Sequence, residues 1–378
     1  MYSSDAQAAW ILFRISLVCF PSGGCGYVGL RQMGSSSGLS VFEGIRLDDS
    51  VLTLKRKYSA RWINDEFDVL VTINSGGFRE DKDFELEQLD VAFFGDSFTF
   101  GQGAKANERY SSVFAQYFPD RKIASLAYAS GFEPEHYEFY FNTHPTLAPK
   151  LVVVGLYLGN DLESDVRETW IHKSQDGRID DVRLPYRKVF QGNLVNRKYR
   201  FPGMSFAARH SFFFRYVLSR LNASKFRDYL FAQDVVFPNM LNSPDTERGR
   251  FGELGLRSLD SLGRLNSIVK ERGGRLIVLI IPQDYFVRTN GGYIRPELVA
   301  EIPALIGGSN IKTAVEAFCR VSALDCLDPV KVLTAEDYFA IDSHWTVTGH
   351  AKVGKLLAQH VGTTRVLGIW RTGVPGAP

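Results

Sequence analysis

The chain has 378 residues, of which 45% are hydrophobic and 23% are charged, and its formal net charge at pH 7 is +2. This length suits one large domain or two ordinary ones, and the apolar fraction argues against intrinsic disorder. A net charge this small creates no field that attracts nucleic acid or acidic membranes, and the sequence contains no RNA- or DNA-binding signature. We therefore expect no nucleic-acid partner.

Residues 1–40 form an N-terminal segment that we interpret as an anchor remnant or a linker. The apolar run Ala8–Phe20 contains Arg14, is short for a membrane span, and has no Lys or Arg before it, which is atypical of a signal peptide. Gly24–Gly29 spells a dinucleotide fingerprint and Gly34–Gly38 spells a nucleophile elbow, but neither follows a strand. Both are interpreted as Gly-rich linker. Membrane anchoring or export stays as open as a cytoplasmic location.

Residues 41–89 are expected to form a small β-rich lead-in to the main domain. Phe67–Ile73 has the composition of a strand, and Asn74–Arg79 has that of a turn. Arg79 has two interpretations. It braces this turn against the core, which we favour, or it reaches the functional site.

The stretch Val91–Thr99 predicts a buried strand that delivers one serine to the edge of a sheet. Its apolar run ends abruptly in Gly95-Asp96-Ser97. Open α/β sheets bind their ligands at the carboxyl ends of their strands, where Ser97 would lie. Serine is also a favoured helix cap, so this residue alone does not indicate catalysis.

Strands alternate with helices through the rest of the core, which predicts a parallel, doubly wound α/β sheet. The expected strands cover 89–94, 122–127, 151–157, 275–281 and 323–327. The expected helices include 109–117, 257–272 and 311–321. Five strands of this kind make one sheet covered by helices on both faces.

The third of these strands also ends in polar residues, Gly159-Asn160-Asp161. The carboxamide of Asn160 would lie at the same edge of the sheet as Ser97, where it could stabilise an oxyanion. Asp96 and Asp161 are expected to be structural and to bond neighbouring N–H groups in the turns.

An insertion is expected over 162–250, polar at first and then basic and aromatic. Within it, 210–221 predicts a helix with Phe and Leu on one face. Packing of this helix on the core is the favoured interpretation. A cap over the Ser97 site is the alternative, because the insertion begins at the active-site edge of the sheet.

The C-terminal part of the chain carries Asp342 and His344, two residues apart. In an extended segment both side chains would project to the same side, so that the carboxylate fixes the tautomer of the imidazole. A last core helix is expected over 346–361, followed by a flexible tail over 362–378.

Together these blocks resemble the GDSL/SGNH hydrolase superfamily, over about residues 60–361. The resemblance implies a flavodoxin-like three-layer α/β/α fold with a five-stranded parallel sheet, spanning 41–361. It also implies no cofactor. The implied roles are Ser97 as nucleophile, His344 as base and Asp342 as its orienter, with an oxyanion hole made by the N–H groups of Ser97 and Gly131 and the side chain of Asn160. Two features depart from the family pattern: only Ser343 separates the Asp from the His, and no Asn precedes Gly131.

Three functions stay open at this point. The first is a serine esterase that removes acyl groups, O-acetyl included, from a small molecule or a glycan. The second is an O-acyltransferase that uses the same residues on a polysaccharide. The third is a non-catalytic glycan-binding module, against which the intact Ser97, His344 and Asp342 weigh.

The four cysteines and seven histidines show no metal-ligand spacing, so no metal is expected. Cys319 and Cys326 are either a disulfide pair, if the protein is exported, or two buried thiols. His350 is expected in the final helix, facing the core or the solvent.

Overall fold

A computed structural model describes residues 18–19, 25–26, 45–48, 51–54, 56–128, 132–159, 161–162, 170–173, 179–183, 195–222, 230–235, 244–288 and 311–363. Residues 1–37 and 38–378 form two compact units. In the first unit, the antiparallel pair β1 (Val18–Cys19) and β2 (Cys25–Gly26) is the described part. Both Gly-rich motifs and the apolar run of the N-terminal segment lie mostly outside the described residues.

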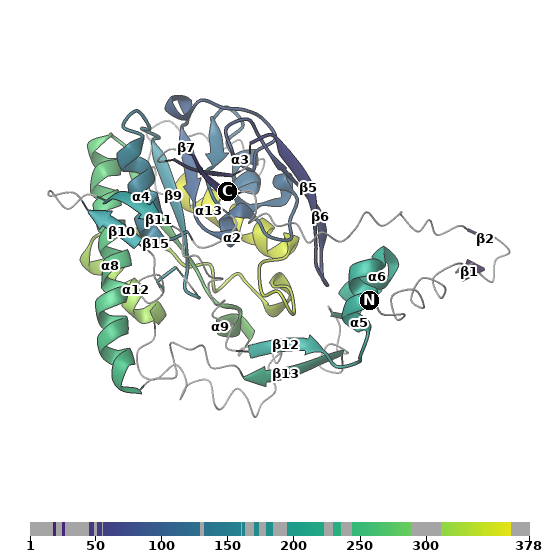
Figure 1. Cartoon of the computed structure of the whole chain (residues 1–378). Coiled ribbons are helices and arrows are strands. Elements are labelled where there is room, and N and C mark those ends of the chain that lie inside the picture. The colour runs from purple at the N-terminus through teal and green to yellow at the C-terminus, as the bar shows by residue number, and fades with distance from the viewer. Residues whose placement is uncertain are drawn as a thin grey trace, which may run out of the picture. The chain divides into compact units, whose positions relative to one another are not determined.

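The second unit is built around one parallel sheet of five strands in the order β15–β14–β9–β7–β8. Figure 1 labels β7, β9 and β15 of this sheet. Along the chain these strands are β7 (Val91–Phe94), β8 (Ile123–Ser125), β9 (Leu151–Tyr157), β14 (Arg275–Ile281) and β15 (Asp325–Leu327). The chain crosses the sheet in the 2-1-3-4-5 order of flavodoxin-like folds. The predicted fold class is confirmed.

Alternate residues of each central strand enter different cores, which makes three layers. On one face, Ala92, Val152 and Val278 pack with α4 (Pro134–Thr143), α8 (Pro244–Glu271) and α12 (Ile311–Val321). On the other face, Phe93, Val153 and Leu279 pack with α3 (Tyr110–Gln116) and α13 (Val347–Thr363). Burial on both faces explains the continuous apolar sequence of these strands.

The lead-in contains two antiparallel hairpins, β3 (Ile45–Asp48) with β4 (Val51–Leu54) and β5 (Tyr58–Ile63) with β6 (Asp68–Ile73). Buried β6 residues, Val71 and Ile73 among them, join the same core as α4 and α8. The β5–β6 hairpin is therefore packed on the main domain.

In its described part, the predicted insertion contains further hairpins and helices, and α8 begins near its end. The hairpins pair β10 (Trp170–Lys173) with β11 (Ile179–Arg183) and β12 (Val195–Tyr199) with β13 (Phe231–Val235). The helices are α5 (Met204–His210) and α6 (Phe212–Asn222). Tyr199, Leu218 and Phe231 form a small core with Ala340, and Ile341 packs against it. This part of the insertion thus contacts the segment that carries Asp342.

Most predicted helices are found within two residues of their expected ends, with one exception. Helix α8 begins at Pro244, well before the predicted 257, and helix α4 was not predicted. The start of α4 carries a helix signal in the sequence, since Pro134 occupies its first turn and Glu133 and His136 form a capping box. Its many aromatic residues obscure the pattern.

A disulfide joins Cys319 of α12 to Cys326 of β15, with 6.1 Å between the two Cα atoms. The sequence left open whether these cysteines form a disulfide or are two buried thiols, and in the structure they form the disulfide. Among the described helices, none has the length and apolar character needed to cross a bilayer.

Candidate active site

Ser97 lies just beyond the end of β7, at the first position of the short helix α2 (Ser97–Phe100). Asp96 caps this helix by accepting a hydrogen bond from the Phe98 N–H at 3.0 Å. Gly95 is required at the strand end because a Cβ there would lie 2.0 Å from Thr99 Oγ1. The residues next to Ser97 in the sequence therefore determine its position at the end of the strand.

His344 lies in an irregular segment between the short 3₁₀ helix Ala335–Asp337 and α13. The prediction that Asp342–His344 is extended is wrong. Ala340–Asp342 forms a turn, and Ser343 has a left-handed backbone with φ 65°. Ser343 Oγ donates to the buried Asp284 carboxylate at 3.0 Å, which helps to hold this conformation. A turn, not a strand, brings the carboxylate beside the imidazole.

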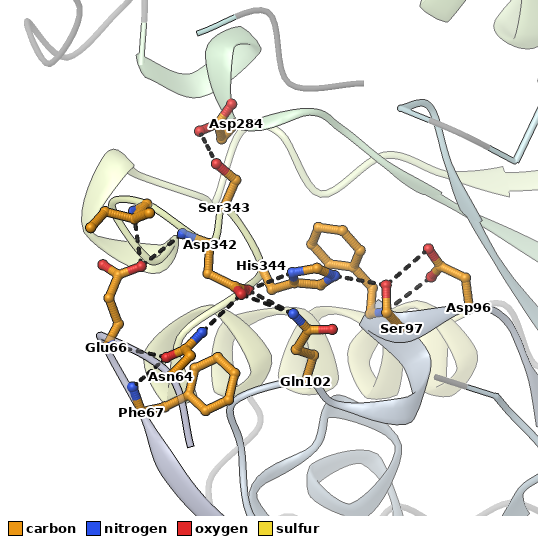
Figure 2. A network of polar contacts seen from close by, with 12 residues as sticks. Asn64, Glu66, Phe67, Asp96, Ser97, Gln102, Asp284, Asp342, Ser343 and His344 are labelled. Carbon is orange, nitrogen blue, oxygen red and sulfur yellow. Dashed lines mark hydrogen bonds and ion pairs between the residues drawn. The ribbon is translucent and has the colours of Figure 1, made fainter. Parts of the chain in front are cut away.

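The structure brings Ser97, His344 and Asp342 into one chain of hydrogen bonds (Figure 2). Ser97 Oγ is 2.7 Å from His344 Nε2, and His344 Nδ1 is 2.6 Å from Asp342 Oδ1. With the Nδ1 proton donated to the carboxylate, Nε2 is left to accept the serine proton. The three residues come from two distant segments of the chain, since Ser97 and His344 are 247 positions apart in the sequence.

The surroundings of His344 shift its basicity in two directions. Burial lowers the pKa of His344, but the charge and hydrogen bond of Asp342 and the charge of Asp96 raise it, and the net pKa lies above the ordinary 6.5. Burial raises the pKa of Asp96 to about 6, against the attraction of His344. The Phe98 ring covers the imidazole, with 4.6 Å between ring centroids. The imidazole is therefore basic and shielded from water.

Two amide side chains that the sequence did not indicate also hold the Asp342 carboxylate. Gln102 Nε2 donates to both carboxylate oxygens, at 3.1 and 2.9 Å, and Asn64 Nδ2 donates to Oδ2 at 3.0 Å. Gln102 follows the Ser97 helix, whereas Asn64 comes from the β5–β6 turn, 278 positions away from Asp342. A residue this distant gives no local sequence signal.

Arg79 braces the backbone, as the favoured interpretation had it. It donates to the carbonyls of Phe100 and Gly101, both at 2.8 Å, and of Ala104 at 2.6 Å. Burial and the nearby Arg109 lower the pKa of Arg79 to about 9. These bonds join the turn that ends at Arg79 to the end of the Ser97 helix and to the residues that follow it.

Other predicted polar residues have structural positions. Asp161 accepts the Tyr157 N–H at 2.8 Å, as expected for a turn residue. His350 is fully buried in α13, where it accepts the Tyr110 N–H at 3.3 Å, and burial lowers its pKa to about 3. His350 thus faces the core.

The two remaining oxyanion residues of the prediction, Gly131 and Asn160, lie outside the described residues. Their neighbours Tyr128 and Phe132 stack at 3.9 Å between ring centroids, and Gly159 lies in the turn after β9. Within the part of the chain that the structure describes, His, Cys, Asp and Glu side chains nowhere gather in threes as a metal site would require.

No protein-family model and no curated protein sequence matches this chain. Among solved structures, the chain is similar to a protein from Bacteroides fragilis described as an acylhydrolase, with 11% identity, TM-score 0.33, and coverage of 72% of this chain and 86% of that one. It is also similar to a protein of Desulfitobacterium hafniense described as lipolytic and of the G-D-S-L family, with 11% identity, TM-score 0.32, and coverage of 71% and 97%. A third is TesA, with 8% identity, TM-score 0.33, and coverage of 72% and 98%. Likenesses this weak do not establish an activity, so the function must rest on the geometry of the site.

Proposed function

We propose that this chain is a serine esterase of the SGNH type. One observation carries the proposal: Ser97 Oγ, His344 and Asp342 form a continuous hydrogen-bonded chain with contacts of 2.7 and 2.6 Å. A serine within hydrogen-bond reach of a base, with the base oriented by a third group, is the arrangement that activates a hydroxyl as a nucleophile.

The proposed reaction has two steps. His344 Nε2 takes the proton of Ser97 as Oγ attacks the ester carbonyl, and the resulting imidazolium is stabilised by Asp342. Collapse of the tetrahedral intermediate releases the alcohol, which takes the proton from His344. Water then attacks the acyl-enzyme with His344 again as the base, and the acid leaves as Ser97 is restored.

The oxyanion would be held by the N–H groups of Ser97 and Gly131 and by the Asn160 side chain, as the sequence resemblance implies. Removing one such donor typically raises the barrier by about 2.7–4 kcal/mol. Substituting Asn160 by Ala should therefore lower kcat about 100- to 1000-fold while leaving Ser97 reactive. An unchanged kcat would remove Asn160 from the oxyanion hole.

The proposed substrates are acyl esters of small molecules or glycans, with O-acetyl esters as the first to try. The test is hydrolysis of a panel of short acyl esters by the purified protein and by Ser97→Ala. We expect turnover by the native protein and its loss in Ser97→Ala. Equal residual rates in both proteins would contradict a serine mechanism. Repeating the assay with a polysaccharide acceptor distinguishes transfer, in which the acyl group appears on the acceptor, from hydrolysis.

A further inference from the structure

The turn between β5 and β6 contacts residues 339–342 of the segment that carries Asp342. The Glu66 carboxylate accepts three consecutive backbone N–H groups, from Ala340 at 2.6 Å, Ile341 at 2.8 Å and Asp342 at 2.7 Å. Figure 2 shows Glu66 beside the backbone of Asp342. From the same turn, Asn64 Nδ2 donates to Asp342 Oδ2 at 3.0 Å. One contact set holds the backbone under the carboxylate, and the other holds the carboxylate itself.

The turn is itself fixed, so it can serve as a support. Asn64 Oδ1 accepts the N–H groups of Glu66 at 2.8 Å and Phe67 at 2.9 Å, which orients the amide so that Nδ2 points to Asp342. The Phe67 ring is buried and lies 5.3 Å from the Phe339 ring, centroid to centroid. Asp65, which lies between Asn64 and Glu66 in the sequence, accepts hydrogen bonds from Ser205 and Arg209 of α5.

The supported segment lacks regular secondary structure of its own. Ala340–Asp342 is a turn whose N–H groups are directed to Glu66 rather than to a strand or a helix. Buried backbone N–H groups need acceptors, so the conformation of this turn depends on the Glu66 carboxylate. The left-handed Ser343 that follows adds a second reason why the turn needs outside support.

We infer that Glu66 and Asn64 are positioning residues for the proposed reaction: Glu66 fixes the backbone on which Asp342 stands, and Asn64 fixes the rotation of its carboxylate. The inference rests on the proposed Ser97–His344–Asp342 mechanism. Neither residue touches the reacting atoms, and both act through Asp342. A displacement of about 1 Å in such a group can cost about 100-fold in rate.

The pH dependence of Ser97 reactivity separates positioning from a merely structural role. Among the described charged groups, the carboxylates of Asp342 and Asp96 raise the pKa of His344. Glu66 faces Asp342, and its own pKa is raised first by burial. If Asp342 moves away from the imidazole, the pKa of His344 must fall. The acid limb of the pH profile, where the reaction rate of Ser97 rises as His344 loses its proton, must then move to lower pH. A loss of folded protein would lower the rate at every pH and leave the limb in place.

The first variant is Glu66→Gln, whose single carbonyl oxygen cannot accept all three N–H groups. The readout is the rate at which a fluorophosphonate probe labels Ser97 between pH 5 and 9, a range chosen to bracket the ordinary His pKa of about 6.5. We expect labelling about 10- to 100-fold slower and an acid limb at lower pH. An unmoved limb in folded Glu66→Gln would overturn the inference.

The second variant, Asn64→Ser, keeps a short side-chain oxygen that can accept the N–H groups of the turn but lacks the amide that donates to Asp342. The freed carboxylate should turn away from the imidazole, so the pKa of His344 should fall and the acid limb should move to lower pH, in the same direction as in Glu66→Gln. This variant keeps the turn-forming acceptor, and it decides the matter if Glu66→Gln fails to fold. A limb at the native position would show that residue 64 does not act on Asp342.

A double substitution and a matched control complete the test. Glu66→Gln combined with Asp342→Asn should label no more slowly than Asp342→Asn alone, because Glu66 acts through the carboxylate that is already missing. A double variant whose rate loss equals the product of the two single rate losses would contradict this. Asp65→Asn removes a carboxylate from the same turn that faces α5 instead, and it should leave the limb unmoved. Native protein that is not labelled at all would overturn the proposed function rather than this inference.

Discussion

The two halves of the candidate site are built in different ways. Ser97 stands between a strand buried on both faces and a helix that its neighbour Asp96 caps, so residues 91–100 largely determine its position. His344 and Asp342 stand in an irregular turn whose contacts come from distant parts of the chain, namely Asn64, Glu66, Gln102 and Asp284. We therefore expect changes in the residues that surround Ser97 to damage folding, and changes in the turn around Asp342 to damage chemistry as well as folding.

After removal of Ser97 or His344 itself, the largest effect on chemistry is expected from Asp342→Asn. An amide cannot hold the imidazole in the required tautomer, and the corresponding change in a serine protease lowers kcat about 10⁴-fold. The sign of the pH effect follows from the contacts: Asp342 raises the pKa of His344 and burial lowers it, so the pKa falls once the carboxylate is gone. Because the base must be neutral, the acid limb of kcat/KM should move to lower pH, by about 1 to 3 units.

The chain offers a matched control for this variant. Asp325 also accepts from a histidine, His360 Nε2, at 2.9 and 3.0 Å, but it lies at the edge strand β15. Asp325→Asn should leave kcat and the pH profile unchanged. A profile that moves equally in both variants would mean that the shift does not report the Asp342–His344 pair.

Gly95→Ala tests the first half of the site. The added methyl group would lie 2.0 Å from Thr99 Oγ1, inside the helix that Ser97 begins, so the strand end or the helix must shift. Overpacking of this kind typically costs about 1–3 kcal/mol. Urea unfolding should show the loss. Gly263→Ala on α8 is the control, because its methyl group meets the Phe318 ring at an ordinary 3.8 Å, and stability should hold or rise. Equal stability of the two variants would contradict a tightly built strand end.

Ser343 tests how the second half stores strain. Ser343→Ala loses the hydrogen bond to Asp284 and keeps the unfavourable φ of 65°, whereas Ser343→Gly loses the same bond but relieves the backbone. We expect Ala to cost about 1–3 kcal/mol and Gly to cost less. Thermal unfolding of both variants measures this order. An alanine variant more stable than the glycine variant would exclude strain at this position.

The disulfide lies in neither half and should matter least for turnover. Cys319→Ser with Cys326→Ser opens a short loop, and the loss of chain restriction is worth about 2–3 kcal/mol. We expect a lower unfolding midpoint with unchanged kcat. A fall in kcat at a temperature where the variant is folded would show that the β15 edge affects the site. A persistent disulfide is also typical of an oxidising compartment.

The same difference decides what the sequence could predict. Continuous apolar strands and their polar ends follow local rules, so the five strands, their parallel arrangement and Ser97 could be predicted from residue pattern. Asp342 and His344 could be named as candidates because they lie close together in the chain. Their geometry could not, because it depends on a left-handed Ser343 that no sequence rule anticipates.

The supporting residues could not be predicted for a physical reason. Asn64 looks like an ordinary turn residue, and Glu66 looks like an exposed charge beside it. Only the packing of the β5–β6 hairpin on the main domain brings them to positions 340–342.

The most direct test of the account is the covalent labelling of Ser97 by a fluorophosphonate probe, located by peptide mass mapping. We predict a single adduct on Ser97 that forms faster as the pH rises through the pKa of His344, and that is nearly absent in His344→Ala. No adduct on the folded protein, or labelling of Ser97 that is indifferent to His344, would contradict an activated serine at this site.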